Sequence, residues 1–200
     1  MLSIKKRQQY LKKLGFYKGK IDSIEGKETK NAYKKLQKKY FKRPKDIDGI
    51  YGNNTEKLLI NAYRVKTYTK NFKLEEFKCG CAERYCTGYP EILDINLLKY
   101  TQEIRKKYGA VYITSGIRCT RYNTLIGGIR GSKHTKGKAI DFYTNYSVKR
   151  LANRKKIINW YANNCLKMYY SYCNGYARWK YRKEYPKVPT MASSIHIDVK

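Results

Sequence analysis

The sequence predicts an α+β protein with two unequal domains, and three observations support this prediction. The chain has 200 residues, whereas single domains usually have ~100–150. A loop pattern occurs twice among helix-like stretches in residues 1–65. Stretches with β-strand patterning follow after residue 109, interspersed with helix-like ones. These observations predict a helical first domain and a second domain that contains both helices and strands.

The repeated pattern is I-D-(S/G)-I-x-G-x-x-T, at residues 21–29 and 47–55. Each copy is predicted to form a loop, because its glycine can take a positive φ, and to lead into a helix. Ser23 stands where the second copy has Gly49, so we expect an altered turn in the first copy. Three short helices fit into residues 1–65, because apolar residues recur at helical spacing around both loops: Ile4, Leu11, Leu14, Ala32, Leu36, Tyr40, Leu58, Leu59 and Ala62.

Residues 66–75 have no clear periodicity and are predicted to link the two domains, so the second domain covers residues 76–200. Within it, the patterns predict a helix over 91–108 that Gly109 can close, short strands over 110–114 and 137–143, and a helix over 147–163 that Ser147 can cap.

The clearest strand is Ile-His-Ile-Asp-Val, residues 195–199. Its alternation sends Ile195, Ile197 and Val199 to one face, and His196 and Asp198 to the other. Burial of the three β-branched residues would present His196 and Asp198 together towards a cleft. The alternative is an edge strand whose polar side chains are solvated.

Both histidines of the chain lie in settings that suit a metal ion. His134 and Asp141 belong to the pattern S-x-H-x-x-G-x-A-x-D, in which Gly137 permits a tight turn and the small Ala139 leaves space beside the carboxylate. Together with His196, they would give a borderline metal three ligands and leave the fourth tetrahedral position to water, as in catalytic zinc sites. The alternative for each of the two histidines is that it is an ordinary packed or exposed residue without a metal.

The formal net charge of +30 predicts attraction to polyanions. Charge alone does not choose among nucleic acid, anionic lipid and acidic cell-wall polymer, and a bias towards A- and T-rich codons would give the same lysine excess. Basic residues interleaved with 22 tyrosines also suit stacking on nucleic-acid bases. However, neither helix-turn-helix nor zinc-finger spacing is present in the sequence.

The N-terminal stretch is basic but has no continuous apolar segment of the length that a signal peptide needs, and no later segment is apolar enough to span a bilayer. We therefore expect synthesis in the cytoplasm, no membrane insertion, and a separate release step if the protein acts outside the membrane.

The cysteines leave several alternatives open. Their even number permits disulfides outside the cell, whereas free thiols are expected in a reducing cytoplasm. The first four could form a second, structural zinc site, but C-x-C-x4-C is not the usual ligand spacing, which favours packed free thiols or later disulfides. The six residues are Cys79, Cys81, Cys86, Cys119, Cys165 and Cys173.

The segments RQQYLKKLGFYKGKID and DIDGIYGNNTEKLL resemble the three-helix peptidoglycan-binding module of many cell-wall hydrolases. The resemblance covers about a third of the chain, with both loops in the right order. It implies that residues 1–65 bind peptidoglycan. The alternative is a generic helical domain that is stabilised by its neighbour.

The second domain carries the pattern S-G-x-R-x4-N-x3-G-G-x3-S-x-H-x2-G-x-A-x-D, followed by a late H-x-D. Its residues are Ser115, Gly116, Arg118, Asn123, Gly127, Gly128, Ser132, His134, Gly137, Ala139, Asp141, His196 and Asp198. This ordered, multi-point pattern resembles the family of zinc D-Ala-D-Ala carboxypeptidases and L-alanyl-D-glutamate endopeptidases. The resemblance covers residues 74–200 and implies a compact α+β fold with a small antiparallel sheet.

By position, the resemblance implies that His134, Asp141 and His196 bind one catalytic Zn²⁺. It makes Arg118 the cation that holds the substrate carbonyl or carboxylate and stabilises the tetrahedral intermediate, a role that suits its planar, permanently charged fork. Ser132 would bind the substrate backbone or fix the metal loop, with a helix N-cap as an equal alternative. The candidate substrate-binding residues are Ser115, Asn123 and Ser132.

One departure from the family pattern concerns the general base. The family commonly has an acidic residue or a histidine two or three positions before the last zinc histidine, where this chain has Ser194 and Ser193. Neither serine is a competent base alone. Asp198 is expected to orient His196, with an ion pair to a lysine as its alternative, and Glu184 could approach from the preceding loop. The base stays unassigned.

The resemblance implies a peptidoglycan hydrolase that cleaves a stem-peptide bond, either between L-Ala and D-Glu or near a D-Ala end. We expect the protein to be a monomer. A small two-domain hydrolase without a signal peptide resembles a bacteriophage endolysin, which accumulates in the host cytoplasm and reaches the cell wall after a membrane lesion. Its cationic surface would bind anionic wall polymers in a salt-sensitive manner. The alternatives are a non-catalytic wall-binding protein and, less favoured, a basic nucleic-acid-binding protein.

Overall fold

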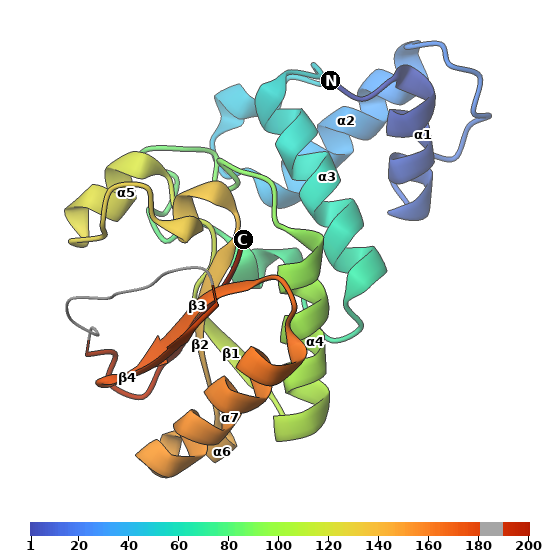
Figure 1. Cartoon of the computed structure of the whole chain (residues 1–200). Coiled ribbons are helices and arrows are strands. Elements are labelled where there is room, and N and C mark those ends of the chain that lie inside the picture. The colour runs from blue at the N-terminus through green and yellow to red at the C-terminus, as the bar shows by residue number, and fades with distance from the viewer. Residues whose placement is uncertain (181–189) are drawn as a thin grey trace.

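The computed structural model describes residues 1–180 and 190–200 and confirms the α+β class (Figure 1). Helices α1 to α3 lie to one side of a sheet, and the remaining helices surround that sheet. The described helices are α1 (Ile4–Lys13), α2 (Lys27–Tyr40), α3 (Asn53–Tyr68), α4 (Ile95–Tyr108), α5 (Thr120–Leu125), α6 (Asn145–Val148) and α7 (Leu151–Asn164), with short 3-10 turns η1 (Pro44–Asp46), η2 (Leu74–Phe77) and η3 (Lys133–Lys136).

The sheet contains β1 (Val111–Ser115), β2 (Ala139–Thr144), β3 (Met168–Cys173), β4 (Tyr176–Trp179) and β5 (Ile195–Val199). Their order is β1-β2-β5-β3-β4, and each described pair of neighbours is antiparallel. Because β5 lies between β2 and β3, the edge-strand alternative for residues 195–199 is wrong. All five residues of β5 are buried, so its polar side chains face the interior of the protein.

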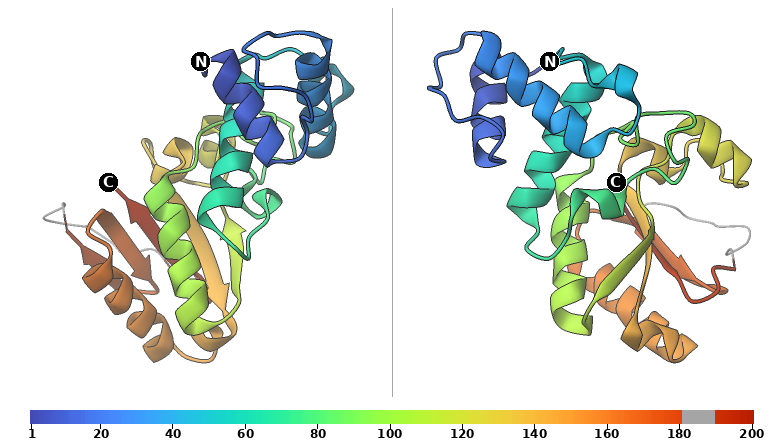
Figure 2. Two further views of the ribbon diagram at one scale, coloured as in Figure 1. Left: turned by 90° about the vertical axis from the view of Figure 1, so that its right-hand side faces the viewer. Right: turned by 180° about the vertical axis from the view of Figure 1, so that it is seen from behind.

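Helices α4 and α7 lie side by side against the sheet (Figure 2). They bury the apolar face of β5, because Ile195, Ile197 and Val199 share a hydrophobic core with apolar residues of both helices. Alternation along the strand therefore places His196 and Asp198 on the opposite face of the sheet.

The N-terminal helices share this hydrophobic core with the sheet. Helix α3 also forms hydrogen bonds to the segment that precedes α4. The amide of Asn61 donates to the carbonyl oxygen of Glu91 and accepts from the backbone N–H of Leu93, both at 2.8 Å. Arg64 donates to the carbonyl oxygen of Leu93. These contacts join the helical part of the chain to the mixed part.

The segment 66–75, which we expected to be a linker, is partly helical and well packed. Helix α3 continues to Tyr68, and Leu74 begins η2 and is buried. Between them, the side-chain oxygen of Gln102 on α4 accepts the backbone N–H of Lys70 at 2.8 Å. Bonds from a distant side chain hold this segment, so it needs no apolar periodicity of its own.

Two element boundaries and one hairpin differ from the sequence-based expectations. Helix α4 begins at Ile95, after the N-cap Asp94, because the preceding residues contact α3 instead. The helix expected over 147–163 is divided into α6 and α7, and Ser147 lies inside α6, whose N-cap is Thr144. Strands β3 and β4 were missed because tyrosines dominate β3 and occupy both buried and half-buried positions, which hides the alternation.

Two buried glutamines, Gln8 on α1 and Gln37 on α2, hold the repeated loops in the same way. The amide nitrogen of each donates to the aspartate, a carbonyl oxygen and the threonine of its loop, and the amide oxygen accepts the backbone N–H at the third position of the repeat. The partners are Asp22, Ser23, Ile24 and Thr29 for Gln8, and Asp48, Gly49, Ile50 and Thr55 for Gln37. The two loops are therefore built alike, although the sequence pattern did not identify these glutamines.

Ser23 adopts the same turn as Gly49, so the expected alteration of the first turn is wrong. Its φ is 66°, against 78° for Gly49, and this left-handed conformation disfavours a side chain.

We expect Ser23→Gly to raise the free energy of unfolding by about 0.5–1 kcal/mol. The matched substitution Gly49→Ser should lower the free energy of unfolding. It places a side chain on a left-handed residue, and its Cβ would lie 3.3 Å from the carbonyl oxygen of Lys30. Thermal unfolding of both variants checks this; a Ser23→Gly protein less stable than wild type would contradict it.

Candidate metal centre and active site

Three predicted ligands, His134, Asp141 and His196, converge on the face of the sheet opposite α4 and α7. Asp141 on β2 pairs in register with His196 on β5, and His134 comes from η3. One donor atom from each side chain lies within 4.8 Å of the others. All three residues are buried, with exposed fractions of 2%, 6% and 6%. The structure thus brings together residues that are far apart in the chain.

Gly137 makes the turn that carries His134 towards Asp141. It ends η3 in the left-handed conformation, with a φ of 66°. A Cβ at this position would overlap the carbonyl group of Ile92. Only glycine fits this turn without strain, which confirms its predicted role.

A backbone carbonyl orients the His134 ring. Nδ1 lies 2.8 Å from the carbonyl oxygen of Gly116, and because that oxygen can only accept, Nδ1 donates its proton there. Burial lowers the pKa of His134 below its ordinary value of 6.5, so the ring is neutral and Nε2 carries a lone pair. The donor that faces the other ligands is therefore Nε2.

Asp141 completes an arrangement that suits a cation. Burial raises its pKa, but the neighbouring imidazoles outweigh burial and hold the pKa of the Asp141 carboxyl well below the ordinary 3.8, so the group is ionised. Its Oδ1 lies 3.2 Å from Nε2 of His134, so a lone pair and a carboxylate oxygen face each other. A cation between them would remove this repulsion, and two imidazoles with one carboxylate are a donor set that zinc accepts. The residues therefore fit a zinc ion.

His196 lies between two carboxylates. Nδ1 is 2.8 Å from Oδ1 of Asp141, and Nε2 is 3.4 Å from Oδ2 of Asp198. Burial lowers the pKa of His196, but its bonds to both carboxylates outweigh burial and raise that pKa to about 9. Tyr172 on β3 stacks on the ring, with centroids 4.6 Å apart. The plane and the orientation of this imidazole are both fixed.

The carboxylate of Asp198 has a partner on each oxygen. Oδ1 accepts the backbone N–H of Tyr170, and Oδ2 faces His196. Among residues 1–180 and 190–200, Asp198 forms no ion pair with a lysine, which is the alternative that we considered for it. These contacts are the ones that an orienting residue makes.

Arg118 lies beside the three ligands. Its Nη2 donates to Oδ2 of Asp141, and its Nε donates to the hydroxyl of Ser115 at 2.7 Å. Its backbone N–H also donates to the carbonyl oxygen of His134 at 3.1 Å. The hydrogen bonds to Asp141 and Ser115 therefore hold the guanidinium next to the candidate metal centre.

The other two candidate substrate-binding residues make structural contacts. Asn123 is buried and donates to the carbonyl oxygen of Ile129 at 3.1 Å, and it packs against Gly128, where a Cβ would overlap its amide. Ser132 is the N-cap residue of η3, but its side chain makes no capping hydrogen bond. Neither residue bonds to the three ligands within the described part of the chain.

The positions that commonly carry the base hold serines, as the sequence indicates. The hydroxyl of Ser194 lies 3.3 Å from that of Thr114. Glu184 lies outside the described residues. Two contributors to the site were not predicted: the carbonyl of Gly116, and Tyr172, for which the sequence has no signal because β3 was not predicted.

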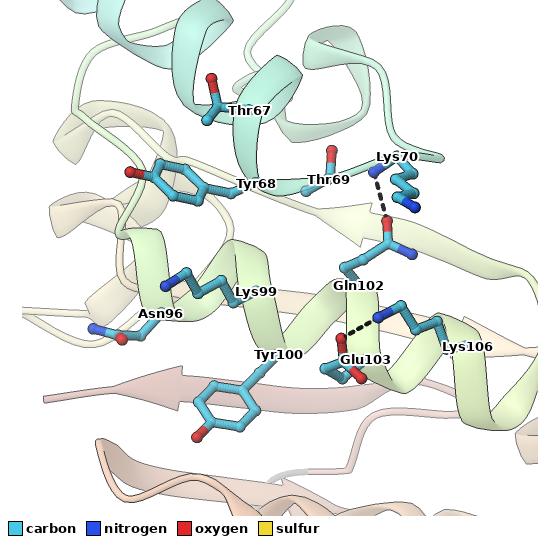
Figure 3. Close-up of a pocket in the computed structure, with 10 residues that line it drawn as sticks. All are labelled: Thr67, Tyr68, Thr69, Lys70, Asn96, Lys99, Tyr100, Gln102, Glu103 and Lys106. Atoms are coloured by element: carbon cyan, nitrogen blue, oxygen red, sulfur yellow. Dashed lines mark hydrogen bonds and ion pairs between the residues drawn. The ribbon is translucent and has the colours of Figure 1, made fainter.

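A separate surface pocket of about 510 Å³ lies between the end of α3 and one face of α4 (Figure 3). Three of its ten lining residues are lysines, and none of the candidate site residues takes part. The pocket therefore belongs to a different surface from the candidate metal centre.

No helix in the described part of the chain combines the length and the apolar character that crossing a membrane requires.

Family models match segments in both parts of the chain. Residues 70–165 match the family model of Peptidase M15, and residues 3–59 match the model described as "Putative peptidoglycan binding domain". No curated protein matches the chain. The first match contains Arg118, His134 and Asp141, and the second contains both repeated loops. The chain is thus similar to Peptidase M15 over residues 70–165 and to a peptidoglycan-binding domain over residues 3–59, a combination that supports a peptidoglycan peptidase.

Proposed function

We propose that the protein is a zinc-dependent peptidoglycan hydrolase of the endolysin type, which cleaves a stem-peptide bond of the L-Ala-D-Glu or D-Ala-D-Ala kind. The observation that carries the proposal is the convergence of His134, Asp141 and His196 beside Arg118 within a Peptidase M15 domain. In this proposal, synthesis occurs in the cytoplasm and the enzyme acts at the cell wall after release.

The zinc ligands in this proposal are Nε2 of His134, a carboxylate oxygen of Asp141 and Nδ1 of His196. When bound, zinc lowers the pKa of a water molecule from 15.7 towards ~7 and polarises a carbonyl group. The protein contributes the fixed direction of these donors, because Gly116 holds one imidazole and Asp198 the other. Preorganised ligands need no rearrangement when substrate binds.

Arg118 positions the substrate in this mechanism. Ser115 and Asp141 engage two of its five N–H groups. Those that remain can donate to a substrate carbonyl or carboxylate and stabilise the negative charge that develops on the oxygen. The proposal thus gives Ser115 the task of holding Arg118, and gives Arg118 the contact with substrate.

Asp198 is a positioning residue in this proposal. It accepts Nε2–H of His196, which leaves Nδ1 for the metal. We expect Asp198→Ala to weaken zinc binding about 10–100-fold. Titration of the loaded protein with a competing chelator measures this, and circular dichroism of the zinc-free variant checks that it is folded. Unchanged zinc affinity in a folded variant would contradict the role.

The N-terminal domain and the charge account for binding to the wall. Residues 3–59 match a peptidoglycan-binding family, and the net charge of +30 favours anionic wall polymers as additional partners. Because exposed charges are screened by salt, the polymer-dependent part of this affinity should fall as ionic strength rises.

Digestion of purified peptidoglycan tests the proposed activity. Wild type and His134→Ala are incubated with the polymer, each with and without a chelator, and the fragments are analysed by mass spectrometry. We expect new amino ends at one defined stem-peptide bond, only in wild type without chelator. Wall binding without cleavage would instead favour the non-catalytic protein, for which the serines before His196 are the supporting observation.

A further inference from the structure

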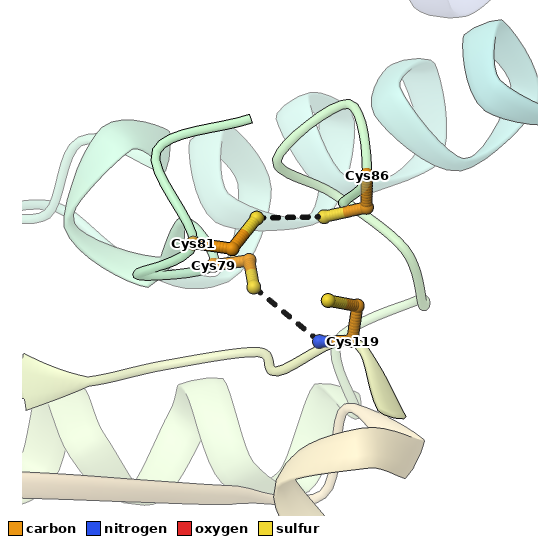
Figure 4. Close-up of side chains that lie close together, drawn as sticks. All are labelled: Cys79, Cys81, Cys86 and Cys119. Carbon is orange, nitrogen blue, oxygen red and sulfur yellow. Dashed lines mark hydrogen bonds between the residues drawn. The ribbon is translucent and has the colours of Figure 1, made fainter. Parts of the chain in front are cut away.

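Four cysteines form a second candidate metal-binding cluster, distinct from the group of His134, Asp141 and His196 (Figure 4). Cys79, Cys81 and Cys86 belong to the segment after η2, and Cys119 lies just before α5. Their sulfur atoms all lie within 4.8 Å of one another, and those of Cys81 and Cys86 are 3.5 Å apart. Cys79 and Cys81 are buried, and Cys119 is only 9% exposed. The fold thus gathers four thiols in a protected place.

The spacing of these sulfur atoms suits a metal ion with tetrahedral coordination. Four thiolates at ~2.3 Å from a zinc ion lie about 3.8 Å from one another. Backbone N–H groups also point at two sulfurs: that of Cys119 donates to Cys79 at 3.3 Å, and that of Gly88 donates to Cys86 at 3.4 Å. Such donors stabilise the negative charge of metal-bound thiolates.

We propose that Cys79, Cys81, Cys86 and Cys119 bind one structural zinc ion, in addition to the ion of the active site. A closed set of four thiolates is the ligand set of structural zinc, which keeps no position open for water. The unusual C-x-C-x4-C spacing argued against such a site, but Cys119 supplies the fourth ligand from a distant segment. This inference does not depend on the proposed peptidase activity.

The ion would hold the arginine of the active site in place. Cys119 directly follows Arg118, and the preceding residue, Ile117, donates its backbone N–H to the carbonyl oxygen of Phe77 at 3.0 Å. A metal bond from Cys119 to the segment 79–86 would reinforce this contact. Loss of the ion would free the backbone that carries Arg118.

The same cluster adjoins the peptidoglycan-binding domain. Glu83 lies between Cys81 and Cys86, and its carboxylate accepts the backbone N–H of Lys42, just after α2, at 2.9 Å. The carboxylate also pairs with Lys78. A zinc ion that orders this loop would therefore also order a contact between the two parts of the chain.

Metal analysis of the full-length protein, purified with a reductant, tests the site. We expect two zinc ions per chain in wild type, one in Cys119→Ser and one in Asp141→Asn. The control Cys165→Ser should keep both, because Cys165 is a buried cysteine outside the cluster. If the active-site ion were absent, wild type would hold one zinc, which Cys119→Ser would lose and Asp141→Asn would keep. The failure of one site is thus distinguishable from the failure of the other.

Two measurements on the wild-type cluster test the site even if the Cys119→Ser variant does not fold. Titration of wild type with a mercurial thiol reagent should release the cluster's zinc as its four thiols react. Replacement of zinc by Co²⁺ should give a thiolate charge-transfer band, which Asp141→Asn retains. Equal zinc content in Cys119→Ser and wild type, disulfides among the four cysteines, or the visible absorption of an iron–thiolate centre would each overturn the proposal.

Discussion

Asp141→Asn is expected to lower the rate of peptidoglycan cleavage at least about 10³-fold, because metal-assisted chemistry supplies several kcal/mol of transition-state stabilisation. Among the carboxylates that the structure describes, Asp141 is the one that contacts His134, His196 and Arg118 together. An amide of the same shape removes the negative charge that a divalent cation needs and that the guanidinium pairs with. The release of new amino ends from purified peptidoglycan measures the rate, and metal analysis shows whether zinc is lost with it.

A matched aspartate provides the control. Asp46 in η1 pairs with Arg43, away from the candidate metal centre, so Asp46→Asn should change the rate less than about twofold, as expected for a surface ion pair. An Asp141→Asn enzyme with nearly wild-type turnover would remove Asp141 from the zinc ligands and with it the proposed mechanism.

Arg118→Ala is expected to lower kcat/KM about 10²–10³-fold, the effect of losing one donor to a developing oxyanion. Zinc content should stay near that of wild type, because Arg118 contacts a ligand without being one. Arg118→Lys should recover only part of the rate, since an ammonium keeps the charge but not the planar fork that also bonds Ser115. Steady-state kinetics on a soluble stem peptide separates these effects from binding to the wall.

The control for charge is Arg130→Ala, which removes an exposed arginine in the loop before Ser132. Its activity on the soluble peptide should match that of wild type. If Arg118→Ala were as active as Arg130→Ala, then Arg118 would serve only to pair with Asp141, and another group would have to bind the substrate oxygen.

The parts of the fold that were predicted are those with strong local patterns. Helices α1 to α3 follow from apolar periodicity and a repeated loop, and β5 follows from strict alternation. The convergence of His134, Asp141 and His196 was also expected, because both histidines lie in patterns that suit a metal ion and the whole motif resembles a zinc peptidase family. Gly137 was expected to permit a tight turn, and a Cβ there would overlap the carbonyl group of Ile92.

The missed parts depend on contacts between distant residues. The glutamines Gln8 and Gln37 look like ordinary helix positions until the loops fold onto them. The cysteine cluster needs Cys119, whose approach to Cys79 is decided by how β1 leads into α5. Sequence spacing contains no record of such approaches, so the four cysteines could be named as one possible zinc site but their proximity could not be predicted.

The bonds of Asn61 and Arg64 to the backbone before α4 limit how this protein can be re-engineered. One way to change the binding specificity of such a protein is to exchange its N-terminal domain for another. A cut near residue 65 would divide α3 and expose apolar surface on both parts of the chain. A chimera joined at that point would need a replacement helix with an asparagine and an arginine at the positions of Asn61 and Arg64. Exchange upstream of α3, within the first repeated loop, would leave that junction intact.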